Sequence, residues 1–311
     1  MKPGWKTAAA AAALLAACTG GPLPAQEEIA CNPCWMSRHA HDGEVVEIRM
    51  QGSVELADDD ASVRAIRSGG YLLLVEQGTR RPDRRALYTP GADGGVRLDF
   101  RREGNRRELD AADRAWIREM LRRAVEDGLN AERRAEAIHR RGGVPALLDE
   151  AERLDGDGVR RKYYAEAIES PSLRPAEAAR ILRHAGREIE SGGDLARFLR
   201  AFVDRRGDLL ADAAVREAFF AAAASLRSDG DRARVLIHVL ERAGDRAAVS
   251  ADALQSARGI GSDGDKTRVL TRVPRTALAS RGVADAYRST LQTIRSAGDR
   301  RRAQNHLSGT R

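Results

Sequence analysis

The sequence has few cysteines, few aromatic residues and no long apolar run beyond its N-terminus. Three cysteines in 311 residues exclude a disulfide-rich small protein, and 29 glycines without a triplet repeat exclude a collagen-like chain. The absence of further apolar runs of about 20 residues excludes a protein with several membrane-spanning helices. Because aromatic residues make up only 4% of the chain, its core must consist mainly of Ala, Leu, Val and Ile. The length allows about two domains.

The excess of positive charge is small and consists almost entirely of arginine. The formal net charge is +7, and only four of the 53 basic residues are lysine. Loss of residues 1–17 would remove Lys2 and Lys6 and no acid, which lowers the charge to +5. Spread over almost three hundred residues, this charge produces a weak field. We therefore expect no nucleic-acid binding.

The first residues are typical of a bacterial export signal. Lys2 and Lys6 precede an apolar stretch over 7–17, which is too short to span a bilayer. The Leu-Ala-Ala-Cys sequence that ends at Cys18 resembles the bacterial lipobox, in which the cysteine is lipidated and becomes the mature N-terminus. Cleavage after Ala25 and an uncleaved start are the alternatives. We expect a signal peptide at 1–17, a lipid-anchored tether at 18–43, and a location in the bacterial cell envelope facing the periplasm or the exterior.

Two further cysteines, Cys31 and Cys34, lie in the expected tether and are closely followed by His39 and His41. In an oxidising compartment a local disulfide between the two cysteines is the favoured interpretation. A zinc site made of all four residues has suitable ligand types, but the spacing leaves little room for a folded finger. A thiol-redox pair is the third alternative, although no βαβ pattern follows it. We expect no cofactor.

Residues 44–109 predict an antiparallel β domain, either a small sandwich or a curled sheet. Apolar residues alternate with polar ones, and Gly-rich or Asp-rich turns interrupt the pattern. Asp110 is a suitable N-cap for a following helix, whose face bearing Trp116, Ile117 and Met120 should pack against the sheet. The expected strands cover residues 45–50, 53–56, 63–66, 71–75, 84–88 and 96–101.

Residues 110–311 are predicted to form a helical repeat array, which makes the fold class α+β. Five glycines recur at intervals of 34–37 residues, each preceded four positions earlier by a large aliphatic residue and followed, in four of the five copies, by Asp. We expect each glycine to end one helix in a left-handed conformation and the Asp to cap the next helix. A single helical hairpin cannot bury its apolar face, so the hairpins should stack into an α-solenoid. The glycines are Gly158, Gly193, Gly230, Gly264 and Gly298.

A basic residue lies four positions after each of these glycines. The simplest interpretation is an ion pair with the Asp three residues earlier on a solvated ridge. The alternative is a row of stacked basic residues that binds an acidic protein partner, although the Asp residues would partly cancel its field. This basic ladder consists of Lys162, Arg197, Arg234, Arg268 and Arg302.

No catalytic motif is recognisable in the sequence, and the helical histidines share no repeat position. His238 lies in an apolar stretch, which predicts a packed core residue. We therefore expect a protein that is not an enzyme and holds no metal, apart from the weaker zinc alternative at the cysteines.

Several segments together resemble a known bacterial region. The stretches 52–60 and 68–72, the helix bearing Trp116 and the Ser-Asp-Gly-Asp repeats are similar to the uncharacterised extracytoplasmic region of some bacterial membrane zinc peptidases of the β-lactam-sensor/antirepressor class and to stand-alone secreted or lipoprotein relatives. The similarity covers roughly residues 44–307 and lacks the peptidase motif. It implies a β module plus helical repeats that senses or binds something outside the cytoplasm.

These features favour a membrane-anchored scaffold or protein-binding module that uses the solenoid surface. The alternatives are an extracytoplasmic sensor or regulatory subunit of an envelope peptidase or signalling complex, and a metal or thiol-redox protein that uses Cys31 and Cys34. The sequence predicts neither the identity of the partner nor the oligomeric state.

Overall fold

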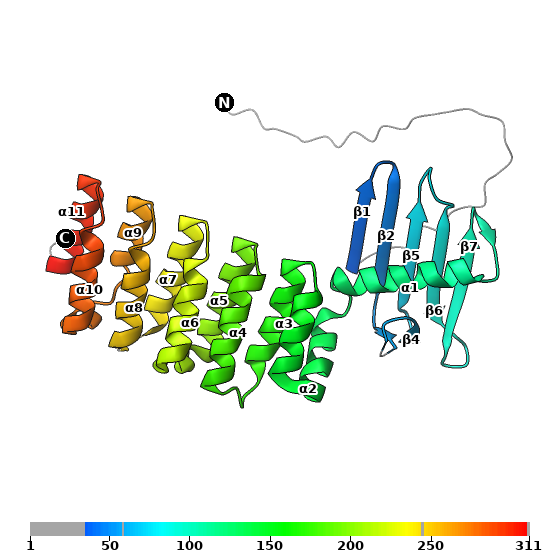
Figure 1. The fold of residues 1–311 in the computed structure, drawn as a ribbon, viewed down its shortest axis with the longest axis horizontal. Coiled ribbons are helices and arrows are strands. Elements are labelled where there is room, and N and C mark those ends of the chain that lie inside the picture. Colours follow the sequence, from blue (N-terminus) through cyan, green and yellow to red (C-terminus); the bar gives the residue numbers. More distant parts are fainter. Residues whose placement is uncertain (1–34, 58, 244–245, 310–311) are drawn as a thin grey trace, which may run out of the picture.

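A computed structural model describes residues 35–57, 59–243 and 246–309. An antiparallel β domain is followed by an extended array of helices (Figure 1). The predicted α+β class is therefore confirmed. Cys18, Cys31 and Cys34 lie outside the described residues. No described helix combines the length and the apolar character that a membrane span requires.

The β domain is a single antiparallel sheet with a small separate hairpin. Its strand order is β1-β2-β5-β6-β7-β8, and β3 pairs with β4. All six predicted strands are present. The strands are β1 (Trp35–His41), β2 (Glu44–Gln51), β3 (Val54–Leu56), β4 (Val63–Ile66), β5 (Tyr71–Gln77), β6 (Arg84–Pro90), β7 (Val96–Arg102) and β8 (Asn105–Arg106).

The first strand corrects the predicted boundary between tether and β domain. Residues 35–41, which we expected in the tether, form β1 and pair along their whole length with β2, from Trp35 opposite Met50 to His41 opposite Glu44. The side chains of β1 are mostly exposed and polar, so the strand has no apolar alternation that the sequence could reveal. Backbone pairing to its neighbour makes it a strand.

Helix α1 (Ala111–Glu126) covers one face of the sheet (Figure 1). Asp110 is its N-cap as predicted, and its side chain accepts a hydrogen bond from the Asp113 backbone N–H at 2.7 Å. Trp116 packs in the core shared with the sheet and lies 6.1 Å from the ring of Phe100. The buried face of the helix is the one that its sequence spacing indicated.

The helical array consists of α2 (Ala131–Arg153) and a series of antiparallel hairpins. Helix α2 is interrupted at Gly143, which adopts a φ of 63°. The hairpins are α3 (Asp157–Glu169) with α4 (Pro175–Glu188), α5 (Gly192–Arg206) with α6 (Ala213–Ala224), α7 (Asp229–Ala243) with α8 (Ala247–Ala257), and α9 (Asp263–Leu270) with α10 (Arg281–Leu291); α11 (Ala297–Ser308) ends the array. We call α3, α5, α7, α9 and α11 the first helices, and α4, α6, α8 and α10 the second helices.

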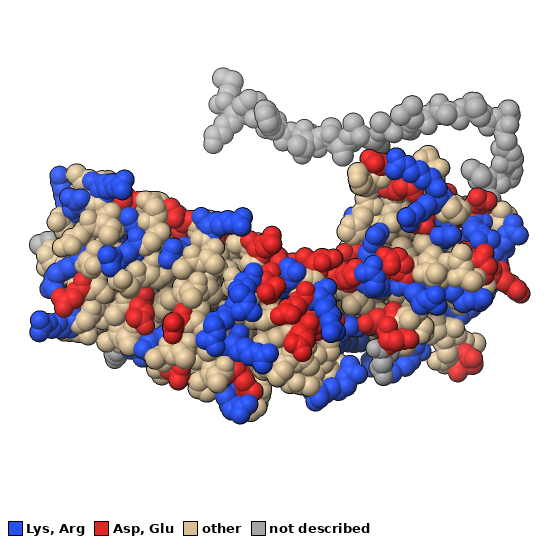
Figure 2. Space-filling view, in the orientation of Figure 1, with Lys and Arg blue, Asp and Glu red and all other residues tan. Residues whose placement is uncertain are grey.

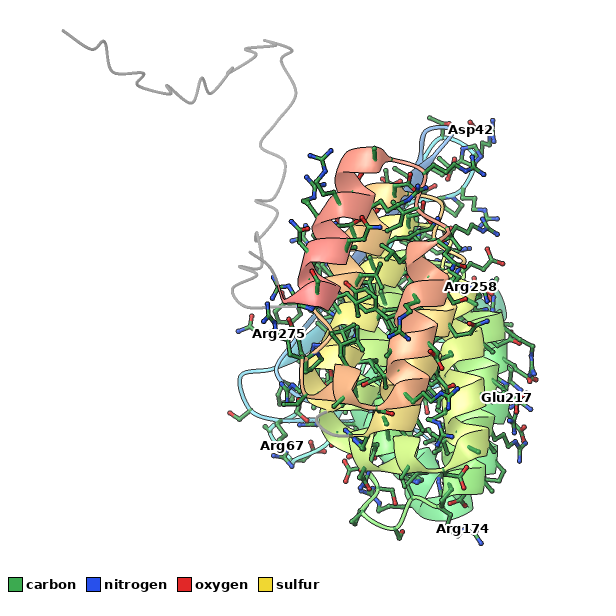
Figure 3. All side chains as sticks on the ribbon, turned by 90° about the vertical axis from the view of Figure 1, so that its left-hand side faces the viewer. Asp42, Arg67, Arg174, Glu217, Arg258 and Arg275 are labelled. Atoms are coloured by element: carbon green, nitrogen blue, oxygen red, sulfur yellow. The ribbon has the colours of Figure 1, made fainter. Side chains whose placement is uncertain are left out.

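The first helices form one layer and the second helices form another. Figure 3, a view from the C-terminal end, shows α11 on the left and α10 to its right, with Glu217 of α6 on the side of α10. All five aliphatic residues that precede the repeat glycines are buried, at 5% exposure or less. They are Leu154, Ile189, Leu226, Ile260 and Ile294.

The repeat glycines do not have the role that the sequence suggested. Each is the second residue of a first helix, and none has a positive φ. In the later repeats the cap is a serine two positions before the glycine, and its hydroxyl accepts a hydrogen bond from the N–H of the predicted capping Asp. The Asp therefore lies one turn inside the helix, where its charge still favours the N-terminus. These serines are Ser191, Ser228, Ser262 and Ser296.

The β domain is held directly against the start of the array. Leu129 is buried in the core of the β domain, just before α2 begins. The Asn130 side chain donates to the Val54 carbonyl of β3 at 2.6 Å, and Arg134 of α2 pairs with Asp60 in the turn before β4. These contacts fix the β domain at the N-terminal end of the array.

Candidate functional site

The basic ladder consists of residues from all five first helices. Arg197 lies 3.0 Å from Asp194, Arg268 lies 2.6 Å from Asp265, and Arg234 and Arg302 pair in the same way with Asp231 and Asp299. These are the predicted pairs between residues three positions apart. Lys162 differs because Val159 replaces the Asp, and it lies 3.7 Å from Glu132 of α2.

Two acids of the ladder, Asp194 and Asp231, have pKa values below the usual value. Arg234 lowers the pKa of Asp231 through a hydrogen bond, with a smaller effect from the Ser228 hydroxyl. For Asp194, burial acts to raise the pKa, but hydrogen bonds from Ser191, Arg161 and Arg197 lower it below its usual value. These carboxylates therefore cancel part of the positive charge at neutral pH.

Two residues of the ladder lie in one shallow groove. Arg234 of α7 and Arg268 of α9 contribute to a hollow of about 440 Å³ that crosses three first helices. We call it the arginine groove. It is lined by Arg200, Arg234, Ile237, His238, Glu241, Arg268, Thr271 and Arg272. The groove therefore joins side chains of α5, α7 and α9, three successive repeats.

Four arginines line this groove, and all four keep N–H donors available. Arg234 and Arg268 pair within their own helices, and Arg272 lies 3.2 Å from Glu241 of α7. Arg200 is exposed and contributes to the lowered pKa of Asp231. A guanidinium has five N–H donors, so one carboxylate contact leaves several for a ligand. The groove is thus suited to carboxylates of a bound chain.

His238 was predicted to be a packed core residue, and this prediction was wrong. Its side chain is 22% exposed at the edge of the arginine groove, and Nε2 lies 2.9 Å from the Asp204 carboxylate of α5. The apolar residues on either side misled the prediction, since Val239 and Leu240 are buried while His238 lies on the outer face of α7.

A larger hollow lies where the β domain meets the array. It has a volume of about 990 Å³ and is lined by residues of β1, β2, α1 and the start of α3, including His39 and His41. His39 Nε2 lies 2.9 Å from the Asp127 carboxylate, and His41 lies 3.2 Å from Asp42. The zinc alternative with Cys31 and Cys34 involves residues outside the described range and stays a prediction.

The charges of this hollow are of both signs. Figure 2 shows acidic side chains gathered where the array meets the β domain, with basic ones beside them, and an even mixture over the rest of the visible face. The lining includes Arg80, Arg81, Arg122 and Arg123 together with six acidic residues. Because positive and negative side chains both line this hollow, it favours neither an acidic nor a basic ligand. The arginine groove is therefore the stronger candidate for a binding site.

The sequence reasoning missed the links between successive repeats. The Asp before the repeat glycine accepts hydrogen bonds from the backbone at the start of the next repeat: Asp157 from Ser191 at 2.6 Å, and Asp229 from Ser262 at 2.8 Å. The base two positions after the glycine donates to a carbonyl that precedes the next repeat, as Lys266 does to Thr293 at 3.1 Å. The Asp before the glycine and the base two positions after it recur in several copies of the repeat. An alignment of the repeats could therefore have indicated these links.

Comparisons of the chain with protein-family models, with curated proteins and with solved structures find no match. The resemblance to the extracytoplasmic region of membrane zinc peptidases therefore stays a prediction.

Proposed function

We propose that this chain is a non-enzymatic, lipid-anchored protein-binding module of the bacterial cell envelope. Lipid on Cys18 would hold it at a membrane surface, and the residues before β1 would act as the tether. Two or three acyl chains suffice for stable anchoring, because each buried methylene contributes about 0.8 kcal/mol. The helical array would then present its first helices to an acidic segment of a protein partner.

The observation that carries this proposal is the arginine groove. It places four arginines from three repeats around one hollow, which Ile237 also lines as an apolar contact. Arginine is favoured at protein interfaces because its planar guanidinium binds carboxylates through two hydrogen bonds and also offers apolar contact. An extended acidic segment lying across α5, α7 and α9 would meet one such group at each repeat.

The rigid attachment of the β domain supports the same proposal. An array of hairpins exposes an apolar end unless a cap covers it. Here Leu129 and Asn130 join the β domain to the first helical segment of the array. The β domain would therefore act as the N-terminal cap, while the opposite end carries the polar residue Gln304 next to buried Ala303.

A photo-crosslinking residue in place of Ile237 tests the binding surface in cells. Glu217 of α6, which lies on the side of the second helices, provides the matched control position (Figure 3). We expect a crosslinked partner from position 237 and none from position 217. Equal products from both positions, or from neither, would contradict a binding surface on the first helices.

The proposed anchor has a separate test. We expect incorporation of radiolabelled palmitate into the chain and its loss in the Cys18→Ala variant. Label that survives this substitution would overturn the anchoring site and would leave the binding surface untouched.

A sensor or regulatory subunit of an envelope peptidase is the second candidate, supported by the sequence resemblance. The same crosslinking experiment separates the two functions. A membrane peptidase among the products of position 237 would favour the sensor, whereas another envelope protein would favour the scaffold.

A further inference from the structure

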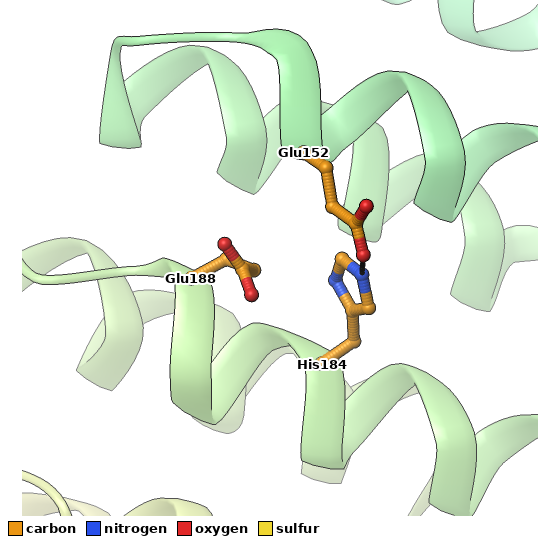
Figure 4. Close-up of side chains that lie close together, drawn as sticks. All are labelled: Glu152, His184 and Glu188. Carbon is orange, nitrogen blue, oxygen red and sulfur yellow. Dashed lines mark hydrogen bonds and ion pairs between the residues drawn. The ribbon is translucent and has the colours of Figure 1, made fainter.

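One histidine and two glutamates converge on the side of the array formed by the second helices. Glu152 lies in the last turn of α2, and His184 and Glu188 lie four residues apart in the last turns of α4. One ligand atom from each side chain lies within 4.8 Å of the others. Figure 4 shows the Glu152 carboxylate next to one ring nitrogen of His184 and the Glu188 carboxylate to the left of the ring.

The imidazole of His184 is buried and held at both nitrogens. The residue is only 5% exposed. Its Nε2 lies 2.8 Å from Glu152 Oε1, and its Nδ1 lies 2.8 Å from the hydroxyl of Tyr164, which is itself buried in α3. Histidines that bind metals are commonly fixed by a hydrogen bond at the second ring nitrogen, which sets the tautomer and the ring orientation. His184 has this arrangement, with Nε2 directed at the Glu152 carboxylate.

The electrostatics of the cluster favour a cation. Two carboxylates lie close together, and the C-terminal ends of α2 and α4 add the negative ends of two helix dipoles. No nearby cation makes a short contact with the two carboxylates among the described residues. Arg160 donates to Asp157 and to the Glu188 backbone carbonyl, and the exposed Arg187 lies 3.9 Å from the Glu188 carboxylate.

We propose that Glu152, His184 and Glu188 bind one divalent transition-metal ion of the Zn²⁺ type. One imidazole and two carboxylates are ligands that Zn²⁺ accepts at about 2.0–2.2 Å, and a water molecule would complete the tetrahedron. The ion takes the position of the present contact between Nε2 and Glu152. The proton of the neutral imidazole then resides on Nδ1 and is donated to the Tyr164 oxygen. Small side-chain rotations of the two glutamates bring their oxygens to one ion.

The position of this site gives the ion a structural role. Glu152 belongs to α2, which contacts the β domain, whereas His184 and Glu188 belong to the first complete hairpin. A bound ion therefore joins the capped start of the array to its first repeat. Binding to the folded state alone stabilises it in proportion to the logarithm of metal concentration over Kd.

Calorimetric titration of the full chain with Zn²⁺ tests the site. The chain carries Cys31→Ser and Cys34→Ser, so that the thiols do not compete for the ion. We expect the parent to bind one Zn²⁺ per chain. The affinity for Zn²⁺ should be at least tenfold weaker in the Glu188→Gln variant than in the parent, and about tenfold weaker in the Tyr164→Phe variant. The matched control is His238→Gln, because His238 has a similar contact with a single carboxylate, Asp204. Its affinity should equal that of the parent.

The thermal unfolding midpoint gives a second readout on the same variants. Zn²⁺ should raise it equally in the parent and in His238→Gln, and should raise it less in Glu188→Gln, which folds because this side chain is only half-buried. Failure to bind one Zn²⁺ per chain, undiminished binding by Glu188→Gln, or equal binding of Mg²⁺ would overturn the proposal. Equal Mg²⁺ binding would mean that the imidazole is not a ligand, since Mg²⁺ prefers oxygen.

Discussion

Two junctions between neighbouring repeats are built from different interactions. Between α7 and α9, Asp229 accepts hydrogen bonds from the backbone at Gly261 and Ser262, and Arg232 donates to the Gly259 carbonyl. Between α5 and α7 the corresponding positions are Gly192 and Leu195, and among the described residues no link of this kind joins these helices. The two helices are instead joined by side-chain contacts, because His238 and Arg242 of α7 lie 2.9 and 3.1 Å from Asp204 of α5. The same repeat geometry is thus maintained with and without links to the backbone of the next repeat.

The junction without these backbone links belongs to the repeat that contains most of the aromatic bulk. Four of the five phenylalanines of the chain lie in α5 and α6, and the rings of Phe202 and Phe219 lie 6.0 Å apart. Burial of such side chains contributes about 1.5–3 kcal/mol each. The comparison teaches that the hairpin without backbone links to the next repeat has the larger aromatic core within itself.

The largest effect is expected for Phe202→Ala. Phe202 is fully buried, so the substitution removes apolar contacts and leaves a cavity, and it should lower the free energy of unfolding by about 3–5 kcal/mol. Denaturant unfolding followed by circular dichroism measures it. Phe220→Ala, at a partly exposed position, should lower the free energy of unfolding clearly less. Equal losses would show that the buried packing of this hairpin is not what stabilises it.

At the polar junction, Asp229→Ala should lower the free energy of unfolding by about 1–2 kcal/mol. It leaves the N–H groups of Gly261 and Ser262 without their acceptor, and the partial exposure of the site lets water compensate in part. Asp229→Asn keeps an acceptor oxygen and should therefore lower the free energy of unfolding less than Asp229→Ala does. If the Ala variant is as stable as the parent in the same denaturant experiment, the links do not hold the repeats together.

The pH dependence of stability tests the next polar junction. Hydrogen bonds from the backbone of Ser296 and Arg295 lower the pKa of Asp263 below its usual value. Its contribution is therefore fully present above the unfolded pKa of about 3.9 and is lost as the pH falls through the lower folded pKa. We expect the stability difference between the parent and Asp263→Asn to be constant from pH 5 to 7, to decrease below about pH 4 and to vanish in stronger acid. A constant difference down to pH 2 would contradict this.

The smallest effect is expected for Gly192→Ala, which should raise the free energy of unfolding by about 0.5–1 kcal/mol. The φ of Gly192 is not positive, and an added Cβ would lie 3.7 Å from Asp231 Oδ2 and 4.0 Å from Leu226, which is ordinary contact. Gly192→Asp should not be more stable than Gly192→Ala, because the new carboxylate would lie near that of Asp231. A large gain in stability by the Asp variant would show that this junction lacked only its link to the backbone of the next repeat.

The sequence predicts most of this fold because its signals are local or periodic. Six strands, the Asp110 cap and the buried aliphatic residue of each repeat follow from alternation, capping chemistry and spacing. Strand β1 could not be found, since polar residues such as Arg38 and His39 become a strand only through pairing with β2. The repeat glycines were located correctly but placed outside the helix, because a glycine is equally compatible with a helix end and with a first turn.

The candidate sites were predictable to different extents. Arg234 and Arg268 were identified from the repeat, but Arg200 and Arg272 enter the arginine groove from other repeat positions, which only the stacking of α5, α7 and α9 brings together. Glu152 and His184 are 32 residues apart and occupy no common repeat position, so their contact depends on the packing of α2 against α4.

The most direct measurement is the affinity of the partner captured at position 237 for a chain with reversed charge in the groove. Arg200→Glu combined with Arg268→Glu should weaken binding at least tenfold and reduce its dependence on salt, because two carboxylate-binding groups are lost. Arg281→Glu is the matched control, since Arg281 is 97% exposed at the start of α10, a second helix. Equal affinities for the parent, the double variant and the control would contradict a binding surface in the arginine groove.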